Sequence, residues 1–417
     1  MDNDSKIYLQ DITKQYLSSD FNGLPICLQN LDNDDRRIIR ELIQDGLIDL
    51  HFGEIHPNPH IKATSLGSKG EQIKNIESDR YEFACAYPTS AHLGLVVDRS
   101  IYDCHPFTLR LALGEPALEF HAFDLDILES YRNDPRYSYT CDDISGNICI
   151  SDRYYEDAAM READKILLRG FGFCFDKNST RAVAAYVRDL SQLSPEHQQK
   201  WETRRISGEF CLHPDFLARS WGQFPKGISV FSAFLKEQKL VNKMCERMGK
   251  PPLFRKIYVE RDRPRYFGFL IRPTRHEYEH FVHSLDRLMS DNLNRKFFRG
   301  DVSLEDEIRQ NDGRIEIRQK GTIKLLEDWL QRKFRTTYRN PINEMIDTFR
   351  EVRKQRQKPA HTNSDDEFNQ DFLHKQRDIM ERAYHAINVL RQIFAQHSSN
   401  RDFNFNSHLD ELVIRMY

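Results

Sequence analysis

The sequence predicts an α+β protein of several domains, and three observations support this fold class. The chain has 417 residues, more than one core usually serves, since domains commonly hold about 100–200 residues. As far as Pro273, segments with the two-residue period of strands alternate with segments of helical period. After Pro273 the chain is strongly charged and keeps only the helical period. We therefore expect three domains, at residues 1–80, 81–273 and 274–417.

The composition is that of a globular protein with a well-solvated exterior. Hydrophobic residues make up 39% of the chain, aromatic residues 11% and charged residues 30%. The net charge of −3 gives no overall attraction to nucleic acid, so any such binding must come from local basic clusters.

The chain carries neither a signal peptide pattern nor a membrane-spanning run. Residues 1–6 are acidic and lack an apolar core, and no later run reaches the ~18–20 apolar residues of a span. The eight cysteines show no C-x-x-C spacing, which favours reduced thiols over a zinc or redox site. We expect a cytoplasmic protein with no membrane contact, no metal and no cofactor.

Residues 1–80 have the pattern of a small helical module with a hairpin. Helices are expected at Lys6–Leu17, at Leu24–Leu31 and from Asp32 to Gly46, followed by a strand at Leu47–Phe52 and a turn-rich stretch at 57–60. This order resembles a winged helix-turn-helix, with the turn as the wing. The resemblance implies that Arg36, Arg37 and Arg40 on the third helix contact DNA or RNA. Alternatively, because the start of that helix is acidic, the module docks onto another protein.

Residues 81–273 predict a mixed domain of unknown role. Strands are expected at Tyr81–Ala86, Leu93–Val97, Leu118–Phe123, Tyr137–Cys141, Ile148–Ser151, Ile166–Phe175 and Tyr266–Ile271. Helices are expected near Leu125–Arg132, Pro195–Arg204 and Val230–Met248.

Four acids around one of these strands raise a second catalytic hypothesis. They are Glu115, Glu119, Asp124 and Asp126, and clustered carboxylates near strand ends can hold a divalent metal for phosphodiester cleavage. A metal-dependent nuclease also needs a lysine on the adjoining strand, and the sequence has none there. The alternative is that these acids are solvated loop residues.

The last third of the chain predicts a four-helix bundle. The helices are expected at His276–Phe298, Thr322–Phe334, from Pro341 to just past Arg356, and at Asp366–Gln396. Each has one apolar stripe, as a bundle helix requires. On the third helix the stripe Met345, Phe349, Val352 continues to Arg356, which predicts that this arginine lies at the rim of the core.

A basic segment, Arg353–His361, joins the third helix to the fourth. Pro359 ends the helix, and the turn that follows brings His361 back toward Arg356. This arrangement resembles the HEPN superfamily, helical bundles with an Arg-x(4–6)-His motif at the end of the third main helix. The resemblance covers roughly residues 275–397.

The HEPN resemblance implies a ribonuclease that needs no metal. In active members the bundles pair, and the arginines and histidines of two protomers cut single-stranded RNA. Here it implies a homodimer formed through the helical bundle, with Arg356 and His361 catalytic and Arg353 and Lys358 positioning RNA. Such ribonucleases commonly serve toxin or antiphage defence systems.

Other interpretations of the basic segment remain open, because its spacing also occurs elsewhere. It recurs at Arg99/His105, Arg275/His280, Arg391/His397 and Arg401/His408. One alternative is a bundle used only for dimerisation or RNA binding, and another is a simple solvated turn. The rival function is a non-enzymatic nucleic-acid-binding regulator that uses the winged helix, with the bundle for dimerisation.

Overall fold

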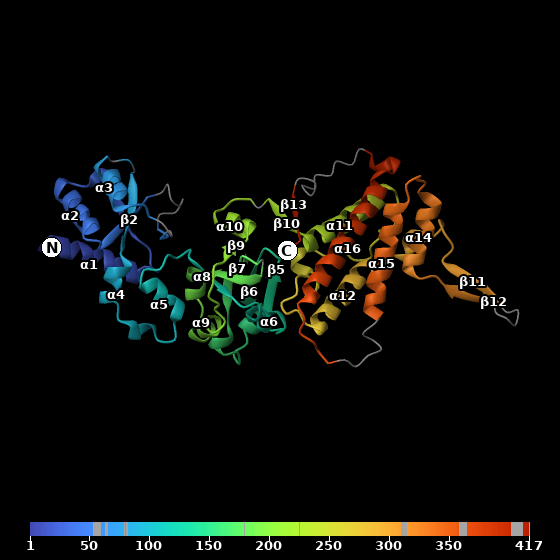
Figure 1. Cartoon of the computed structure of the whole chain (residues 1–417), viewed down its shortest axis with the longest axis horizontal. Coiled ribbons are helices and arrows are strands. Elements are labelled where there is room, and N and C mark those ends of the chain that lie inside the picture. Colours follow the sequence, from blue (N-terminus) through green and yellow to red (C-terminus); the bar gives the residue numbers. More distant parts are fainter. Residues whose placement is uncertain are drawn as a thin grey trace. The chain divides into compact units, whose positions relative to one another are not determined.

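The computed structural model describes residues 1–417 except 53–59, 63–65, 79, 81, 179, 225, 310–314, 358–364, 402–411 and 417. These residues form a mixed α+β protein with two compact units (Figure 1). The first unit is Met1–Tyr139 with Asn147–Leu212, and the second is Thr140–Gly146 with His213–Tyr417. In the part of the chain that the structure describes, no helix is both long and apolar enough to cross a membrane.

The first unit opens with three helices and a three-stranded antiparallel sheet in the order β1-β3-β2. The elements are α1 (Asn3–Ser18), β1 (Leu24–Cys27), α2 (Asn33–Gln44), β2 (Ile48–Phe52), α3 (Lys69–Glu77) and β3 (Phe83–Pro88). Helix α2 begins as the sequence predicts, because Asp32 and Asp35 form a capping box. It ends at Gln44, and Gly46 follows two residues later with a φ of 70°, which suits glycine. Its apolar stripe is buried in the core shared with the sheet.

This region differs from the sequence prediction in two elements, and helix α3, which no pattern predicted, is one of them. The helix predicted at Leu24–Leu31 is wrong, because Leu24–Cys27 is strand β1 and only Leu28–Asn30 form a short 3₁₀ turn. Pro25 lacks an N–H, and it is tolerated because β1 is an edge strand. Of the turn expected as a wing, only His60 lies within the described residues.

The rest of the first unit contains a larger sheet in the order β4-β8-β7-β6-β5, with β9 also paired to β7. Its strands are β4 (Phe120–Phe123), β5 (Tyr137–Cys141), β6 (Ser145–Ile150), β7 (Leu167–Phe175), β8 (Arg181–Tyr186) and β9 (Cys211–Leu212). Its helices are α4 (Ser90–Val96), α5 (Pro106–Ala112), α6 (Asp126–Arg132), α7 (Asp152–Tyr155), α8 (Val187–Ser191) and α9 (Pro195–Glu202). The strand predicted at Leu93–Val97 is wrong, since Thr89 caps a helix there by accepting a hydrogen bond from the His92 N–H.

The second unit is mainly helical and has one large core. Its elements are α10 (Pro214–Ser220), β10 (Gly227–Ser229), α11 (Val230–Arg247), α12 (Arg275–Met289), α13 (Arg295–Phe298), β11 (Glu305–Arg309), β12 (Ile315–Gln319), α14 (Thr322–Lys333), α15 (Asn340–Gln357), α16 (Asp371–Ala395) and β13 (Val413–Arg415). All four helices expected after Pro273 are present, as α12, α14, α15 and α16. Helix α11 buries its apolar stripe in the same core, so this unit begins well before residue 273 (Figure 1).

The strand predicted at Tyr266–Ile271 is also wrong, although its apolar side chains are buried as expected. Side chains take the place of a neighbouring strand here. The Leu270 N–H donates to Gln376 at 3.1 Å, and the Ile271 N–H donates to Glu277 at 2.9 Å. A buried apolar run therefore satisfies its backbone without joining a sheet.

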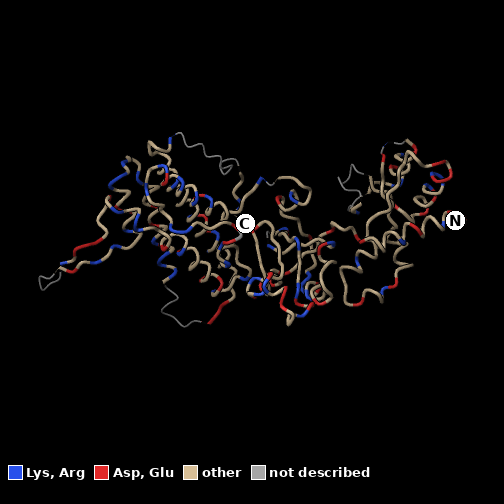
Figure 2. The backbone as a smooth tube through the Cα atoms, turned by 180° about the vertical axis from the view of Figure 1, so that it is seen from behind, with Lys and Arg blue, Asp and Glu red and all other residues tan. Residues whose placement is uncertain are grey.

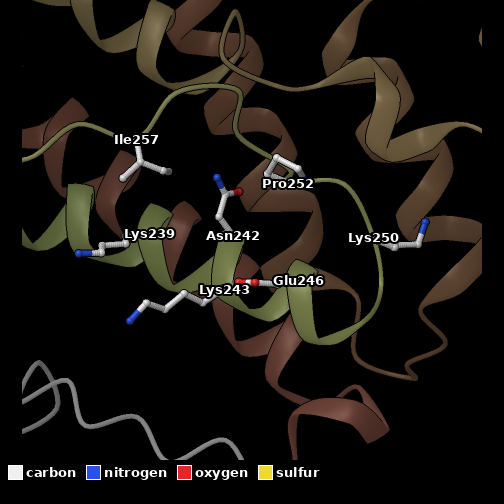
Figure 3. Close-up of a pocket in the computed structure, with 7 residues that line it drawn as sticks. All are labelled: Lys239, Asn242, Lys243, Glu246, Lys250, Pro252 and Ile257. Atoms are coloured by element: carbon white, nitrogen blue, oxygen red, sulfur yellow. The ribbon is translucent and has the colours of Figure 1, made fainter.

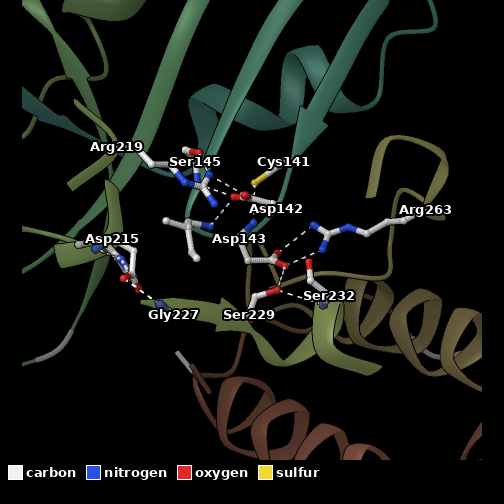
Figure 4. Close-up of polar contacts among 12 residues, drawn as sticks. Cys141, Asp142, Asp143, Ser145, Asp215, Arg219, Gly227, Ser229, Ser232 and Arg263 are labelled. Carbon is white, nitrogen blue, oxygen red and sulfur yellow. Dashed lines mark hydrogen bonds and ion pairs between the residues drawn. The ribbon is translucent and has the colours of Figure 1, made fainter. Parts of the chain in front are cut away.

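A buried ion cluster holds residues 140–146 in the second unit (Figure 4). Asp143 binds the guanidinium of Arg263 through both carboxylate oxygens, at 2.5 and 2.9 Å, and accepts a hydrogen bond from Ser229 at 2.9 Å. Beside it, Asp142 pairs with Arg219 at 2.6 Å. Burial and the charge of Asp143 raise the pKa of the Cys141 thiol to about 12, so this cysteine is an unreactive thiol.

Candidate functional site

Helix α15 carries the arginine that the sequence places at the rim of the core. Its inward residues Met345, Phe349 and Val352 are buried, and Arg356 follows on the same stripe with 28% of its side chain exposed. The helix ends at Gln357. Lys358 and His361, the other two predicted residues of this segment, lie outside the described residues.

Arg356 and Arg353 share two aspartates supplied by α12 and the turn after it. Arg356 Nη1 contacts Asp286 at 2.6 Å and Asp291 at 2.5 Å. Arg353 contacts Asp286 through Nε at 3.0 Å and Asp291 through Nη2 at 2.6 Å. The Asp286 carboxylate is fully buried, and Asp291 is 35% exposed. The four side chains form a neutral, cross-linked network at the end of α15, which we call the Arg–Asp network.

The protonation states within the Arg–Asp network follow from these contacts. Burial of Asp291 favours its neutral form, but hydrogen bonds and charge from Arg356 and Arg353 outweigh this effect and lower its pKa. The hydrogen bond to Asp286 raises the pKa of Arg356 despite partial burial. Arg356 and Asp291 are therefore both charged across the physiological range.

Arg356 keeps hydrogen-bond donors that the network does not use. Both of its contacts with described residues involve Nη1, so its Nε and Nη2 groups have no partner among those residues. Five N–H donors are available on a guanidinium. A fixed arginine with spare donors at a partly exposed helix end can bind an anion such as a phosphate.

Among the described residues, His283 is a histidine whose pKa is affected by the charge of Arg356. It lies exposed on α12, one turn before Asp286. Partial burial, together with the charges of Arg356 and Arg287, lowers its pKa, so the imidazole is neutral at pH 7 and can accept a proton. Nothing in the sequence alone singles it out. Its spacing of three residues from Asp286 has meaning only once Asp286 is known to bind Arg356.

Two further histidines lie close together on α12. The Nε2 atoms of His276 and His280 are 2.9 Å apart, and the ring of His280 stacks on Tyr266 with a centroid distance of 4.6 Å. A metal site needs more ligands than this pair provides. Among the described residues, no group of three or more His, Cys, Asp or Glu side chains could hold a metal ion.

Some of the four acids that suggested a metal nuclease bind other groups of the chain. Glu115 pairs with His121 at 2.7 Å and with Arg110 at 3.4 Å. Burial of Glu119 and the charge of Glu115 raise the pKa of Glu119. Asp124 uses its carboxylate to accept a hydrogen bond from the Asp126 N–H at 2.9 Å. These contacts give the acids roles in the fold.

The three arginines predicted to bind nucleic acid on α2 also have partners within the chain. Arg36 donates to the carbonyls of Leu28 and Ile76, at 2.9 and 2.5 Å, which ties α2 to neighbouring segments. Arg37 pairs with Asp2, Asp34 and Glu41, and Arg40 pairs with Glu77 at 3.8 Å. The positive charge of this helix is therefore largely balanced locally.

A shallow pocket of about 470 Å³ lies beside α11 and has three lysines in its lining (Figure 3). The ammonium groups of Lys239 and Lys243 point away from Pro252, and that of Lys250 lies on the other side. Asn242 uses its amide on the backbone of Phe254. The lysines do not converge on one point, so the pocket is not a phosphate cradle. Figure 2 likewise shows basic and acidic residues interspersed along the helices of this unit.

Asp301 is the ion-pair partner of Lys250. We expect it to make the stability of the fold depend on pH in the acidic range. Burial raises its pKa, but hydrogen bonds from Lys250, Lys333 and Trp329 outweigh burial and lower the pKa to about 2. Because the pKa of Asp301 is lower in the folded than in the unfolded chain, its ionised carboxylate stabilises the fold at pH values above about 3.9, the unfolded pKa. This contribution is lost as the pH falls toward about 2.

Urea unfolding between pH 5 and 2 tests the role of Asp301. Asp301→Asn is expected to be less stable than the wild type at pH 5, with the two converging at pH 2. Equal differences at every pH would contradict the assignment.

Comparison with known proteins gives no relative for this chain. No family model matches it, and no curated protein or solved structure matches it either.

Proposed function

We propose that the second unit is a metal-independent endoribonuclease of HEPN type, with its active site at Arg356 and His361. The observation that carries the proposal is the Arg–Asp network. It fixes Arg356 at the end of the third expected helix and occupies Nη1, which leaves donors for a phosphate. The presence of α12, α14, α15 and α16 at the expected positions supports the same proposal.

The proposed reaction is an acid–base transfer within RNA. A neutral imidazole takes the proton of a ribose 2′-hydroxyl, and the 2′-oxygen attacks the adjacent phosphorus. The bond from phosphorus to the 5′-oxygen breaks, and that oxygen receives a proton from a second imidazole. Arg356 stabilises the charge that builds on the phosphoryl oxygens. His361 is the proposed acid–base residue, and His361 of a second copy is the proposed second imidazole.

The remaining parts of the proposal concern assembly and context. Two copies paired through the helical bundle would place two such sites in one cleft, with Arg353 and Lys358 along the RNA. Arg353 also keeps one nitrogen, Nη1, that its contacts with Asp286 and Asp291 do not use. We further propose a cytoplasmic role in a toxin or antiphage defence system, with the winged-helix-like module recognising DNA or RNA.

The test is cleavage of an end-labelled, unstructured single-stranded RNA by the full chain in EDTA. The wild type is expected to cut it and to leave 2′,3′-cyclic phosphate and 5′-hydroxyl ends. Arg356→Ala and His361→Ala are each expected to lower the rate about 10²–10³-fold, the cost of losing one transition-state donor or one acid–base group.

Arg350→Ala is the matched control, because Arg350 lies on the same helix but pairs with Glu327 at 2.9 Å. It should cut RNA at the wild-type rate. Cleavage that EDTA abolishes, or that is equal in all four proteins, would rule the proposal out. An inactive chain that still retains RNA would favour the non-enzymatic regulator instead.

A further inference from the structure

The hairpin of β11 and β12 has open edges. Every residue of both strands is exposed, and in the described part of the chain this sheet has two strands only. Figure 1 shows it projecting from the helices. A lone two-stranded hairpin is marginally stable in water, and its outer edges present unpaired N–H and C=O groups. Such an edge is a site at which another strand can pair.

Strand β12 combines its open edge with exposed isoleucines. Ile315 is 54% exposed and Ile317 is 65% exposed. They are two residues apart, so they lie on the same face of the strand. Glu316 and Arg318 lie on the opposite face. Proteins usually protect an edge strand with charge or proline, but here two isoleucines lie exposed on one face of the strand.

The sequence of β12 is complementary to itself when two copies run antiparallel about Ile317. In that register Glu316 lies opposite Arg318 of the second copy, and Arg318 lies opposite its Glu316. Ile317 lies opposite Ile317. One face then gains two cross-strand ion pairs, which stabilise strand pairing. On the other face Ile317 packs against Ile317, and Ile315 lies opposite Gln319 of the second copy.

Strand β11 does not have this property. Its residues Glu305, Asp306 and Glu307 are acidic, and antiparallel pairing about its centre sets Glu307 against Glu307. Like charges directly opposite each other destabilise a sheet. The complementarity is therefore specific to the β12 edge.

We propose that β12 binds β12 of a second copy of this chain, antiparallel and centred on Ile317, to form a four-stranded sheet. The occupant is a second copy because a two-fold axis through Ile317 sets each Glu316 opposite an Arg318. The proposal does not depend on ribonuclease activity, since the strand lies outside the Arg–Asp network. A chain that is inactive on RNA but dimeric through β12 would separate the two proposals.

The test is sedimentation velocity of the full chain over a range of concentrations up to about 100 µM, since a contact of this size is at the weak end of specific interfaces. The wild type is expected to form a reversible dimer. Glu316→Arg places an arginine opposite Arg318 at both ends of the register and should weaken the dimer about tenfold or more. Arg318→Glu should do the same with acidic residues.

Mixing the two charge variants provides the decisive measurement. In the mixed complex each arginine again faces a glutamate, so the mixture is expected to recover the association through β12 that each variant alone has weakened. This recovery excludes a simple loss of hairpin structure. A monomeric wild type would overturn the proposal. An association step that is unchanged in both charge variants, with no charge-sensitive step beside it, would also overturn it, because the contact would then lie elsewhere, as pairing through the helical bundle would.

Oxidative cross-linking tests the register. Opposed residues have Cβ atoms about 4.5–5.5 Å apart, close to the disulfide range, so Ile317→Cys should give a disulfide-linked dimer rapidly. Ile308→Cys is the matched control on β11, and the wild type gives the background from exposed Cys104 and Cys211. Equal cross-linking through residues 308 and 317 would refute the register.

Discussion

Replacing Asp143 by alanine is expected to lower the free energy of unfolding of the second unit by about 3–5 kcal/mol, the cost of breaking one side of a buried ion pair. The carboxylate is 3% exposed and its partner Arg263 is 9% exposed. Alanine would leave the guanidinium without this anion in a site closed to water, and the Ser229 hydroxyl would lose its acceptor. Urea unfolding with hydrogen exchange of α11 measures the loss in this unit.

Asp143→Asn separates charge from backbone strain. Asp143 has a positive φ of 70°, which asparagine tolerates better than alanine. Asparagine also keeps a carbonyl oxygen for Ser229. We expect a smaller loss than with alanine, and a double variant with Arg263→Met should lose less than the sum of the single variants. Strict additivity would show that the two side chains do not stabilise one another.

Helical periodicity predicted α2 of the first unit and the helices of the second unit well, because each of these helices has one buried face. The stripes Ile38–Ile43 of α2 and Met345–Val352 of α15 are buried as expected, and α15 does extend to Arg356. Capping residues also predicted the start of α2, because Asp32 and Asp35 lie within four residues of each other. Such local interactions can be predicted from sequence because their partners are neighbours in the chain.

Strands were wrongly predicted or missed where the backbone hydrogen-bonds to groups that are distant in the sequence. Nothing within Tyr266–Ile271 indicates that Gln376 and Glu277 will accept its N–H groups. The same limit applies to β1, because its only strand partner in the described residues is β3, which lies far along the sequence. A buried apolar run alone does not distinguish these cases.

The Arg–Asp network shows the same limit for the candidate site. The sequence predicted an arginine at the rim of the core. It could not identify Asp286 and Asp291, because they lie 70 and 65 residues earlier in the chain. His283 could not be identified for the same reason. Helix packing decides which residues pair with a buried charge, and a single sequence has no pattern that predicts this packing.

Asp286→Ala is expected to destabilise the second unit by about 3 kcal/mol, whereas Arg356→Ala should cost less than half as much. Asp286 is fully buried and accepts hydrogen bonds from both arginines. When Asp286 is removed, two cations keep only Asp291. When Arg356 is removed, Arg353 still binds both aspartates, so no buried charge is left alone. Urea unfolding of the two variants beside the wild type measures this difference.

The same pair of variants separates support from catalysis. If Arg356 binds the phosphate, Arg356→Ala must reduce RNA cleavage far more than it reduces stability. Asp286→Ala must reduce both, because Asp286 holds the same arginine in position. Arg356→Lys keeps one positive charge but loses the planar fork, so its activity should stay low. If Arg356→Ala is as destabilised as Asp286→Ala and still cleaves RNA, Arg356 is a structural clamp and the phosphate binds elsewhere.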